Sequence, residues 1–68
     1  MIVKLIRTKQ SFKGSTPLPA WRVEGAEMYV CQQLDSVLGI QNESFENGDK
    51  IELEIAGVYR TSERKKIA

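Results

Sequence analysis

The sequence lacks histidine altogether and has a single cysteine, Cys31, among its 68 residues. Histidine is the side chain that most often moves protons near neutral pH, so its absence argues against ordinary acid–base catalysis. One cysteine cannot form an internal disulfide, and without histidine a structural zinc site has almost no ligands. We therefore expect a protein that is not an enzyme and that holds neither a metal ion nor a cofactor.

Long apolar runs are also missing. No stretch approaches the roughly 18 residues needed to span a membrane. Charges at positions 4, 7 and 9 interrupt the apolar core that a signal peptide would require. A single cysteine fits a reducing compartment. The sequence therefore predicts a soluble, cytoplasmic protein with no membrane contact.

The chain is short of the features that stabilise small domains. A chain of this size buries only about 60% of its unfolded surface, and disulfides, a metal or a partner chain usually supply the missing stability. The first two have no residues to form them here. A sheet also has edges that must be covered or paired. We therefore predict self-association, as a symmetric homodimer.

Charge is distributed in three blocks, although the formal net charge is only +1. Residues 1–23 carry five basic side chains and no acid, whereas residues 24–54 carry eight acids and one lysine. Residues 55–68 carry four basic side chains and one acid. If the first strand neighbours the strand that contains Glu52 and Glu54, opposite charges face each other and contribute roughly 0.2–1 kcal/mol per pair. The blocks would then be matched inside one fold.

Alternating and β-branched residues predict strands in three places. Residues 2–9 are apolar on both faces, as in a strand inside a sheet. Residues 20–25 and 50–55 alternate apolar and polar side chains. The pair Ala56-Gly57 interrupts the alternation, which predicts a β-bulge or a bend before a short fourth strand at 58–60.

Between these strands, residues 26–38 change to helical spacing. Their apolar side chains cluster within about one third of a helical wheel, which predicts a helix. Gly39 suits the left-handed residue that follows a helix, and Ile40 can pack back on the last turn. The apolar stripe consists of Ala26, Val30, Leu34, Val37 and Leu38.

These elements predict the α+β class, a small two-layer β-β-α-β domain. Its sheet would be antiparallel or mixed, with one helix packed on one face. The domain covers residues 1–60, and residues 61–68 form a basic tail that can fray. The predicted core is Val3, Leu5, Trp21, Val23, Val30, Leu34, Val37, Leu38, Ile51, Leu53 and Ile55.

The residues that could carry out catalysis or bind a metal ion also have simpler structural explanations. Cys31 lies at the margin of the predicted apolar stripe, so we expect a small buried hydrophobic residue rather than a reactive thiol. Glu43, Glu46 and Asp49 crowd one loop but lack the spacing of a calcium loop. We interpret them as a solvated turn and predict no metal site.

Two segments carry a resemblance to a known family. "VLGI" followed by "NGDKIELEI" resembles the pattern of AbrB/MazE-type swapped-hairpin DNA-binding domains. The resemblance covers about a third of the chain, and residues 41–47 separate its two halves. It implies a dimer whose basic N-terminal strand and loop contact DNA through Arg7, Lys9 and Lys13.

Two binding functions follow from the residues. Exposed Met and Tyr beside glutamines are typical of protein interaction surfaces, so we expect a small protein-binding module, such as an accessory or inhibitory protein of the phage or mobile-element type. Its predicted contacts are Met28, Tyr29, Gln32 and Asp35. The alternative is a nucleic-acid-binding regulator, because basic residues gather in the first strand, its loop and the tail. Its predicted contacts are Arg7, Lys9, Lys13, Arg64 and Lys65.

Overall fold

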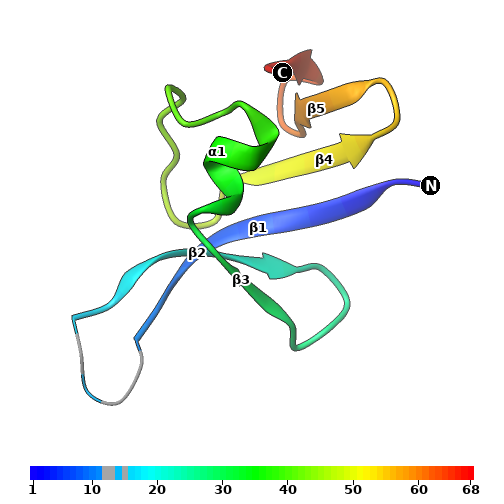
Figure 1. The fold of residues 1–68 in the computed structure, drawn as a ribbon. Coiled ribbons are helices and arrows are strands. Elements are labelled where there is room, and N and C mark those ends of the chain that lie inside the picture. Colours follow the sequence, from blue (N-terminus) through cyan, green and yellow to red (C-terminus); the bar gives the residue numbers. More distant parts are fainter. Residues whose placement is uncertain (12–13, 15) are drawn as a thin grey trace.

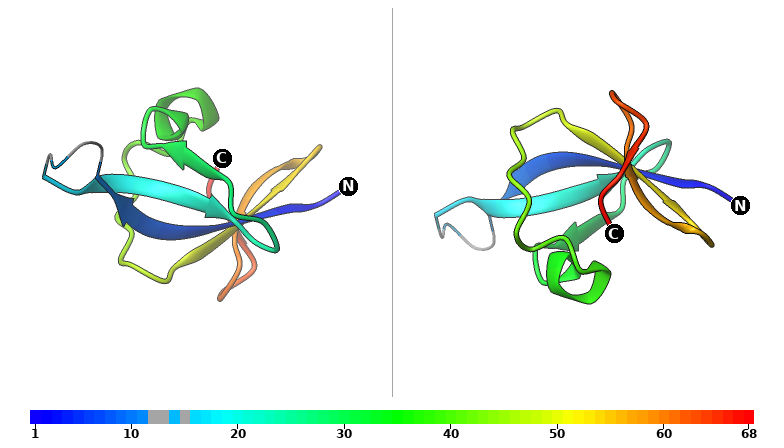
Figure 2. Two further views of the ribbon diagram at one scale, coloured as in Figure 1. Left: turned by 90° about the horizontal axis from the view of Figure 1, so that it is seen from below. Right: turned by 90° about the horizontal axis from the view of Figure 1, so that it is seen from above.

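The computed structural model describes residues 1–11, 14 and 16–68, so Lys13 lies outside the described residues. Six antiparallel strands form one sheet in the order β3-β2-β1-β4-β5-β6 (Figure 1). The views in Figure 2 show how strongly this sheet twists. The elements are β1 (Val3–Gln10), β2 (Leu18–Val23), β3 (Tyr29–Cys31), α1 (Leu34–Leu38), β4 (Lys50–Glu54), β5 (Gly57–Arg60) and β6 (Lys65–Lys66).

The N-terminal strand β1 lies in the middle of the sheet and pairs with both β2 and β4. Leu5 is opposite Val23 on one side and opposite Ile51 on the other. Lys4 is opposite Glu52. The first strand and the strand at residues 50–55 are therefore neighbours, and one basic residue of β1 is opposite an acidic residue of β4.

Strand alternation gives the sheet an inner and an outer face. Leu5, Trp21, Ile51 and Val58 lie on the inner face and are buried, and Ile40 joins them from the connection after α1. Together they form the core, so the predicted burial of three of these strand residues is confirmed. Partly buried side chains pack around them: Val3, Val23, Val30, Leu34, Leu38, Phe45, Leu53 and Ile67.

Two predicted core residues are exposed instead. Ile55 is 100% exposed because it lies in the two-residue turn between β4 and β5, where Glu54 pairs with Gly57. The interruption at residues 56–57 is thus the end of a hairpin turn and not a bulge. Val37 is 80% exposed on α1.

The predicted two-layer α+β fold is wrong, because no helix in the described part of the chain covers a face of the sheet. The helix predicted over residues 26–38 is α1 alone, five residues long and without a buried side chain. Residues 29–31 form the strand β3, which extends the sheet beyond β2. The protein is mostly an antiparallel sheet with one short helix.

Local chemistry explains why the helix does not start earlier. Gln33 occupies the N-cap and makes no side-chain capping hydrogen bond, so the first helical N–H groups gain nothing from it. The segment before it contains Tyr29 and Val30, which favour strands. Gly25 adopts a positive φ of 85° in the turn that returns the chain beside β2. Hairpin pairing with β2 therefore prevails over helical periodicity.

The connection from Gly39 to Asp49 covers the inner face. Gly39 ends α1 with a left-handed φ of 75°, as expected from the sequence, and its neighbour Ile40 is only 1% exposed. Phe45 packs edge-on against Trp21, with ring centroids 5.0 Å apart. Irregular chain, together with Leu34 and Leu38 of the short helix, closes the core.

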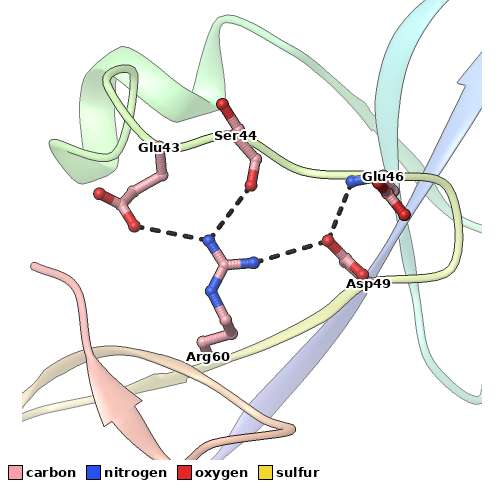
Figure 3. A network of polar contacts seen from close by, with 5 residues as sticks. All are labelled: Glu43, Ser44, Glu46, Asp49 and Arg60. Carbon is pink, nitrogen blue, oxygen red and sulfur yellow. Dashed lines mark hydrogen bonds and ion pairs between the residues drawn. The ribbon is translucent and has the colours of Figure 1, made fainter.

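Arg60 on β5 holds this connection in place (Figure 3). One of its nitrogens, Nη2, lies 3.4 Å from Glu43 Oε1 and donates to the Ser44 carbonyl at 3.2 Å. The other, Nη1, lies 3.5 Å from Asp49 Oδ2. The guanidinium also stacks 4.6 Å from the Phe45 ring centroid. One arginine thus contacts the connection at four residues.

A second arginine, Arg7 on β1, lies among aromatic rings on the inner face. Its guanidinium carbon is 4.7 Å from the Trp21 ring centroid. Asp35 at the start of α1 accepts a 2.6 Å hydrogen bond from the Trp21 indole N–H. The same carboxylate forms a 3.5 Å ion pair with Arg7, without hydrogen-bond geometry. This arrangement ties α1 to β1 and β2.

The C-terminal residues turn back along β5. Val58 donates to the Ala68 carbonyl at 2.8 Å and accepts from the Ile67 N–H at 2.8 Å. Gly57 adopts a φ of 146° and lies against the Ala68 backbone with no room for a Cβ atom. The end of the chain therefore packs where a side chain at position 57 would stand.

Ile51→Ala and Ile55→Ala form a matched pair that tests the fold. Ile51 is fully buried, so its truncation should lower the free energy of unfolding by about 2–5 kcal/mol. Ile55 is fully exposed at the hairpin turn, so its truncation should change that value by less than about 0.5 kcal/mol. Urea unfolding measures both. Equal losses would contradict the turn at residues 55–56.

Candidate protein-binding edge

The sheet ends in two strands of different character. At one edge, β6 carries Lys65 and Lys66, both exposed. At the other, β3 has the sequence Tyr-Val-Cys and no charge. Lysine on an edge strand discourages pairing with another chain. Among the strands that the structure describes, β3 is therefore the edge without this protection.

A tight turn after β2 creates β3. Val23 N–H donates to the Met28 carbonyl at 2.8 Å, and Ala26 N–H donates to the Val23 carbonyl at 3.2 Å. The first of these bonds sets the register, with Trp21 opposite Val30 and Arg22 opposite Tyr29.

That register decides where the β3 backbone groups point. In an antiparallel ladder, hydrogen-bonded and non-hydrogen-bonded pairs alternate. Because Val23 N–H bonds to Met28, Arg22 and Tyr29 form a non-hydrogen-bonded pair. The N–H and C=O groups of Tyr29, and two residues later those of Cys31, are therefore directed away from β2. The outer edge of β3 presents two residues ready to pair with a further strand.

Side chains at this edge alternate as well. Val30 is partly buried and packs against the core, whereas Tyr29 is 44% exposed and Met28, just before the strand, is 58% exposed. Cys31 is exposed, and its thiol donates to Gln33 Oε1 at 2.6 Å. The prediction of a buried Cys31 is wrong, because a strand places this residue on the outer face of the sheet.

A shallow pocket of about 70 Å³ lies beside Cys31 on the outer face. Ala20, one of its lining residues, is opposite Cys31 in the β2–β3 ladder. The hollow is small and open, the size of site that accepts part of one side chain. Its lining residues are Gln10, Leu18, Pro19, Ala20, Cys31, Gln32 and Gln33.

Three of the four predicted protein contacts lie around β3. Met28, Tyr29 and Gln32 are exposed there, although a strand and a turn present them rather than a helix face. Asp35 lies apart from them, because its carboxylate bonds to Trp21 and Arg7 and its side chain is 15% exposed. The Asp35 carboxylate thus connects α1 to the sheet and is not presented for binding a partner.

The predicted nucleic-acid contacts do not form one exposed surface. Arg7 is 11% exposed and lies between Trp21 and Asp35. Arg64 bridges Glu52 at 2.7 Å and Glu54 at 2.6 Å and stacks over Tyr59.

The remaining members of that set are separate from these two arginines. Lys9 and Lys65 are exposed on different strands, β1 and β6, and Lys13 lies outside the described residues. The hydrogen bond to Glu54 raises the pKa of Arg64 above its ordinary value. Arg7 and Arg64 thus both form ion pairs with acidic residues of the same chain.

Other chemistry has little support in the described part of the chain. No group of three or more histidine, cysteine, aspartate or glutamate side chains there could hold a metal ion. Glu43 and Asp49, two of the loop carboxylates, already face Arg60. Among residues 1–11, 14 and 16–68, no helix is long and apolar enough to cross a membrane.

No protein-family model, curated protein or solved structure matches this chain. The segments that resemble swapped-hairpin DNA-binding domains occupy different elements here. "VLGI" ends α1, whereas "NGDKIELEI" forms a turn and β4, and β4 pairs with β1 of the same chain.

The β3 edge was missed at the sequence level because helical and strand periodicity overlap there. The signal that could have found it is the run Tyr29-Val30-Cys31, three strand-favouring residues after a glycine turn. The paired lysines of the basic tail, Lys65 and Lys66, carry a second signal, because lysines also mark a protected edge strand.

Asp35→Ala tests whether Asp35 supports the fold rather than a partner. It leaves the Trp21 indole N–H without its acceptor and Arg7 without its counter-charge, so stability should fall by about 1–3 kcal/mol. Asp35→Asn keeps an acceptor oxygen and should lose less. Fluorescence of Trp21, the only tryptophan, reports unfolding in urea. Unchanged stability in Asp35→Ala would refute the structural role.

Proposed function

We propose that this protein is a non-enzymatic binding module that acts by adding an extended strand of a protein partner to the edge of β3. The single observation that carries the proposal is the contrast between the two sheet edges. The β3 edge is uncharged, and the backbone N–H and C=O groups of Tyr29 and Cys31 are directed away from the sheet. The opposite edge bears two lysines. Strand addition at an open edge is a common mode of peptide recognition.

The composition of the edge suits this mode. Backbone hydrogen bonds from Tyr29 and Cys31 would supply affinity without regard to the partner's sequence, and side chains would supply specificity. Met28 and Tyr29 are exposed next to them, and methionine and tyrosine are enriched in protein interfaces. A module of this size would regulate or inhibit its partner by occupying it. We place it in the cytoplasm, where an exposed thiol stays reduced.

Nucleic-acid binding is a second candidate, favoured by a different observation. Lys4 and Arg22 lie on the outer face of the sheet with Tyr29 near by. Neither cation forms an ion pair with any residue that the structure describes. Open sheet faces with cations and aromatic rings suit single-stranded nucleic acid. Glu52 and Glu54 on the same face weaken this candidate.

Affinity capture with matched variants separates the two candidates. The tagged protein is used to capture ligands from an extract of its native host, with and without nuclease. A protein partner should survive nuclease and be lost with the double variant Met28→Ala/Tyr29→Ala. Each anchor can contribute about 2 kcal/mol of binding energy, so affinity should fall at least about thirtyfold.

The control is Lys4→Ala/Arg22→Ala, which removes two cations that form no ion pair with the described residues and leaves every residue of β3 unchanged. It should retain the protein partner. If instead this control loses the ligand, the ligand is nucleic acid that elutes steeply with salt, and the Met28/Tyr29 variant binds normally, then the protein-binding proposal is wrong.

A further inference from the structure

We propose that the strand that pairs with β3 in the isolated protein is β3 of a second copy of this chain. The two strands run antiparallel about a two-fold axis at Val30, so that the two sheets join. This inference rests on the proposed function, because it names one occupant for the same edge. A protein partner would then compete with the second copy for it.

The direction of the backbone groups selects this register. Tyr29 and Cys31 point their N–H and C=O groups outward, and Val30 points its own toward β2. With the axis at Val30, Tyr29 of each copy is opposite Cys31 of the other, and each of these pairs exchanges two hydrogen bonds. Val30 meets Val30 of the second copy as the non-hydrogen-bonded pair between them. Every outward group of the strand is then satisfied.

Side chains on the outer face are complementary in the same register. Tyr29 of the second copy stands next to Cys31, on the face where the shallow pocket over Ala20 opens. An exposed aromatic ring thus lies beside a hollow that accepts part of a side chain. The two-fold axis repeats the contact, so each copy supplies one ring and one pocket, as a symmetric interface requires.

Charge permits this pairing at β3 and opposes it at β6. Flanking residues at the β3 edge would bring Met28 opposite Gln32 and Glu27 opposite Gln33 of the second copy, so no like charges meet. Two β6 strands would instead bring Lys65 and Lys66 against the same lysines, and like charges directly opposite destabilise a ladder. The charge pattern therefore favours a closed dimer through β3 over an extended chain of sheets.

Sedimentation velocity over a wide range of concentrations, from about 1 µM to about 1 mM, tests the dimer. The wild-type protein should change from monomer to dimer within this range. Tyr29→Ala removes both aromatic anchors and should raise the dissociation constant at least about thirtyfold. Tyr29→Lys and Cys31→Lys place a charge on the edge and should remain monomeric. Circular dichroism confirms that the variants are folded.

The matched control is Ile55→Lys, which places the same charge on a fully exposed residue at the β4–β5 turn and should leave the dimer unchanged. Thiol reactivity gives an independent readout: Cys31 should react more slowly as the wild-type concentration rises, and this dependence should vanish in Tyr29→Lys. A dimer that survives Tyr29→Lys but is lost in Ile55→Lys uses another surface and overturns the inference.

The outcomes also distinguish this inference from the proposed function. If the wild-type protein is monomeric at all concentrations but Tyr29→Lys loses a nuclease-resistant host partner, only the second copy is refuted. If the protein dimerises through β3 and Tyr29→Lys abolishes the dimer, the inference holds whether or not a host partner is captured. If neither dimer nor host partner responds to Tyr29→Lys, both are refuted.

Discussion

The pairing of β1 with β4 is the contact on which the rest of the structure depends. It joins residues 3–6 to residues 50–53 and places the N-terminal strand in the middle of the sheet. Leu5 becomes part of a core only when Ile51 lies beside it. Contacts so distant in sequence carry a loop-closure cost before they contribute stability. The local hairpins β2–β3 and β4–β5 alone would lack β1, the strand that joins them and completes the inner face.

This arrangement also accounts for the distribution of charge along the chain. Arg7 from the first basic block pairs with Asp35, and Arg60 and Arg64 from the last block pair with acids of the middle block. Surface pairs such as those of Arg64 contribute roughly 0–1 kcal/mol each, so they do not drive folding. Their effect is on specificity: the two arginines on the inner face, Arg7 and Arg60, also stack on aromatic rings and hold the irregular connection over the core.

The short helix has a consequence for the surface. If residues 26–38 formed one helix, β3 would not exist and the sheet would end at β2. Because those residues return as a strand, Met28, Tyr29 and Cys31 become exposed at an uncharged edge. The same change moves Asp35 from a predicted interaction face into a hydrogen bond with Trp21. The formation of β3 in place of a helix therefore changes both the predicted fold and the predicted binding residues.

The sequence by itself determined the strands β1, β2 and β4, the buried Leu5, Trp21 and Ile51, and the end of the helix at Gly39, because alternation and glycine conformation are local properties. Only the tertiary structure decided whether residues 26–33 form a helix or a strand, since their apolar spacing suits both and pairing with β2 settles it. It also decided that Ile55 is exposed, although Ile55 continues the alternation of β4. The position of the turn depends on the register in which β5 pairs with β4. The candidate edge belongs to this second group: which strand lies outermost is a property of sheet order, and sheet order is set by contacts across the whole chain.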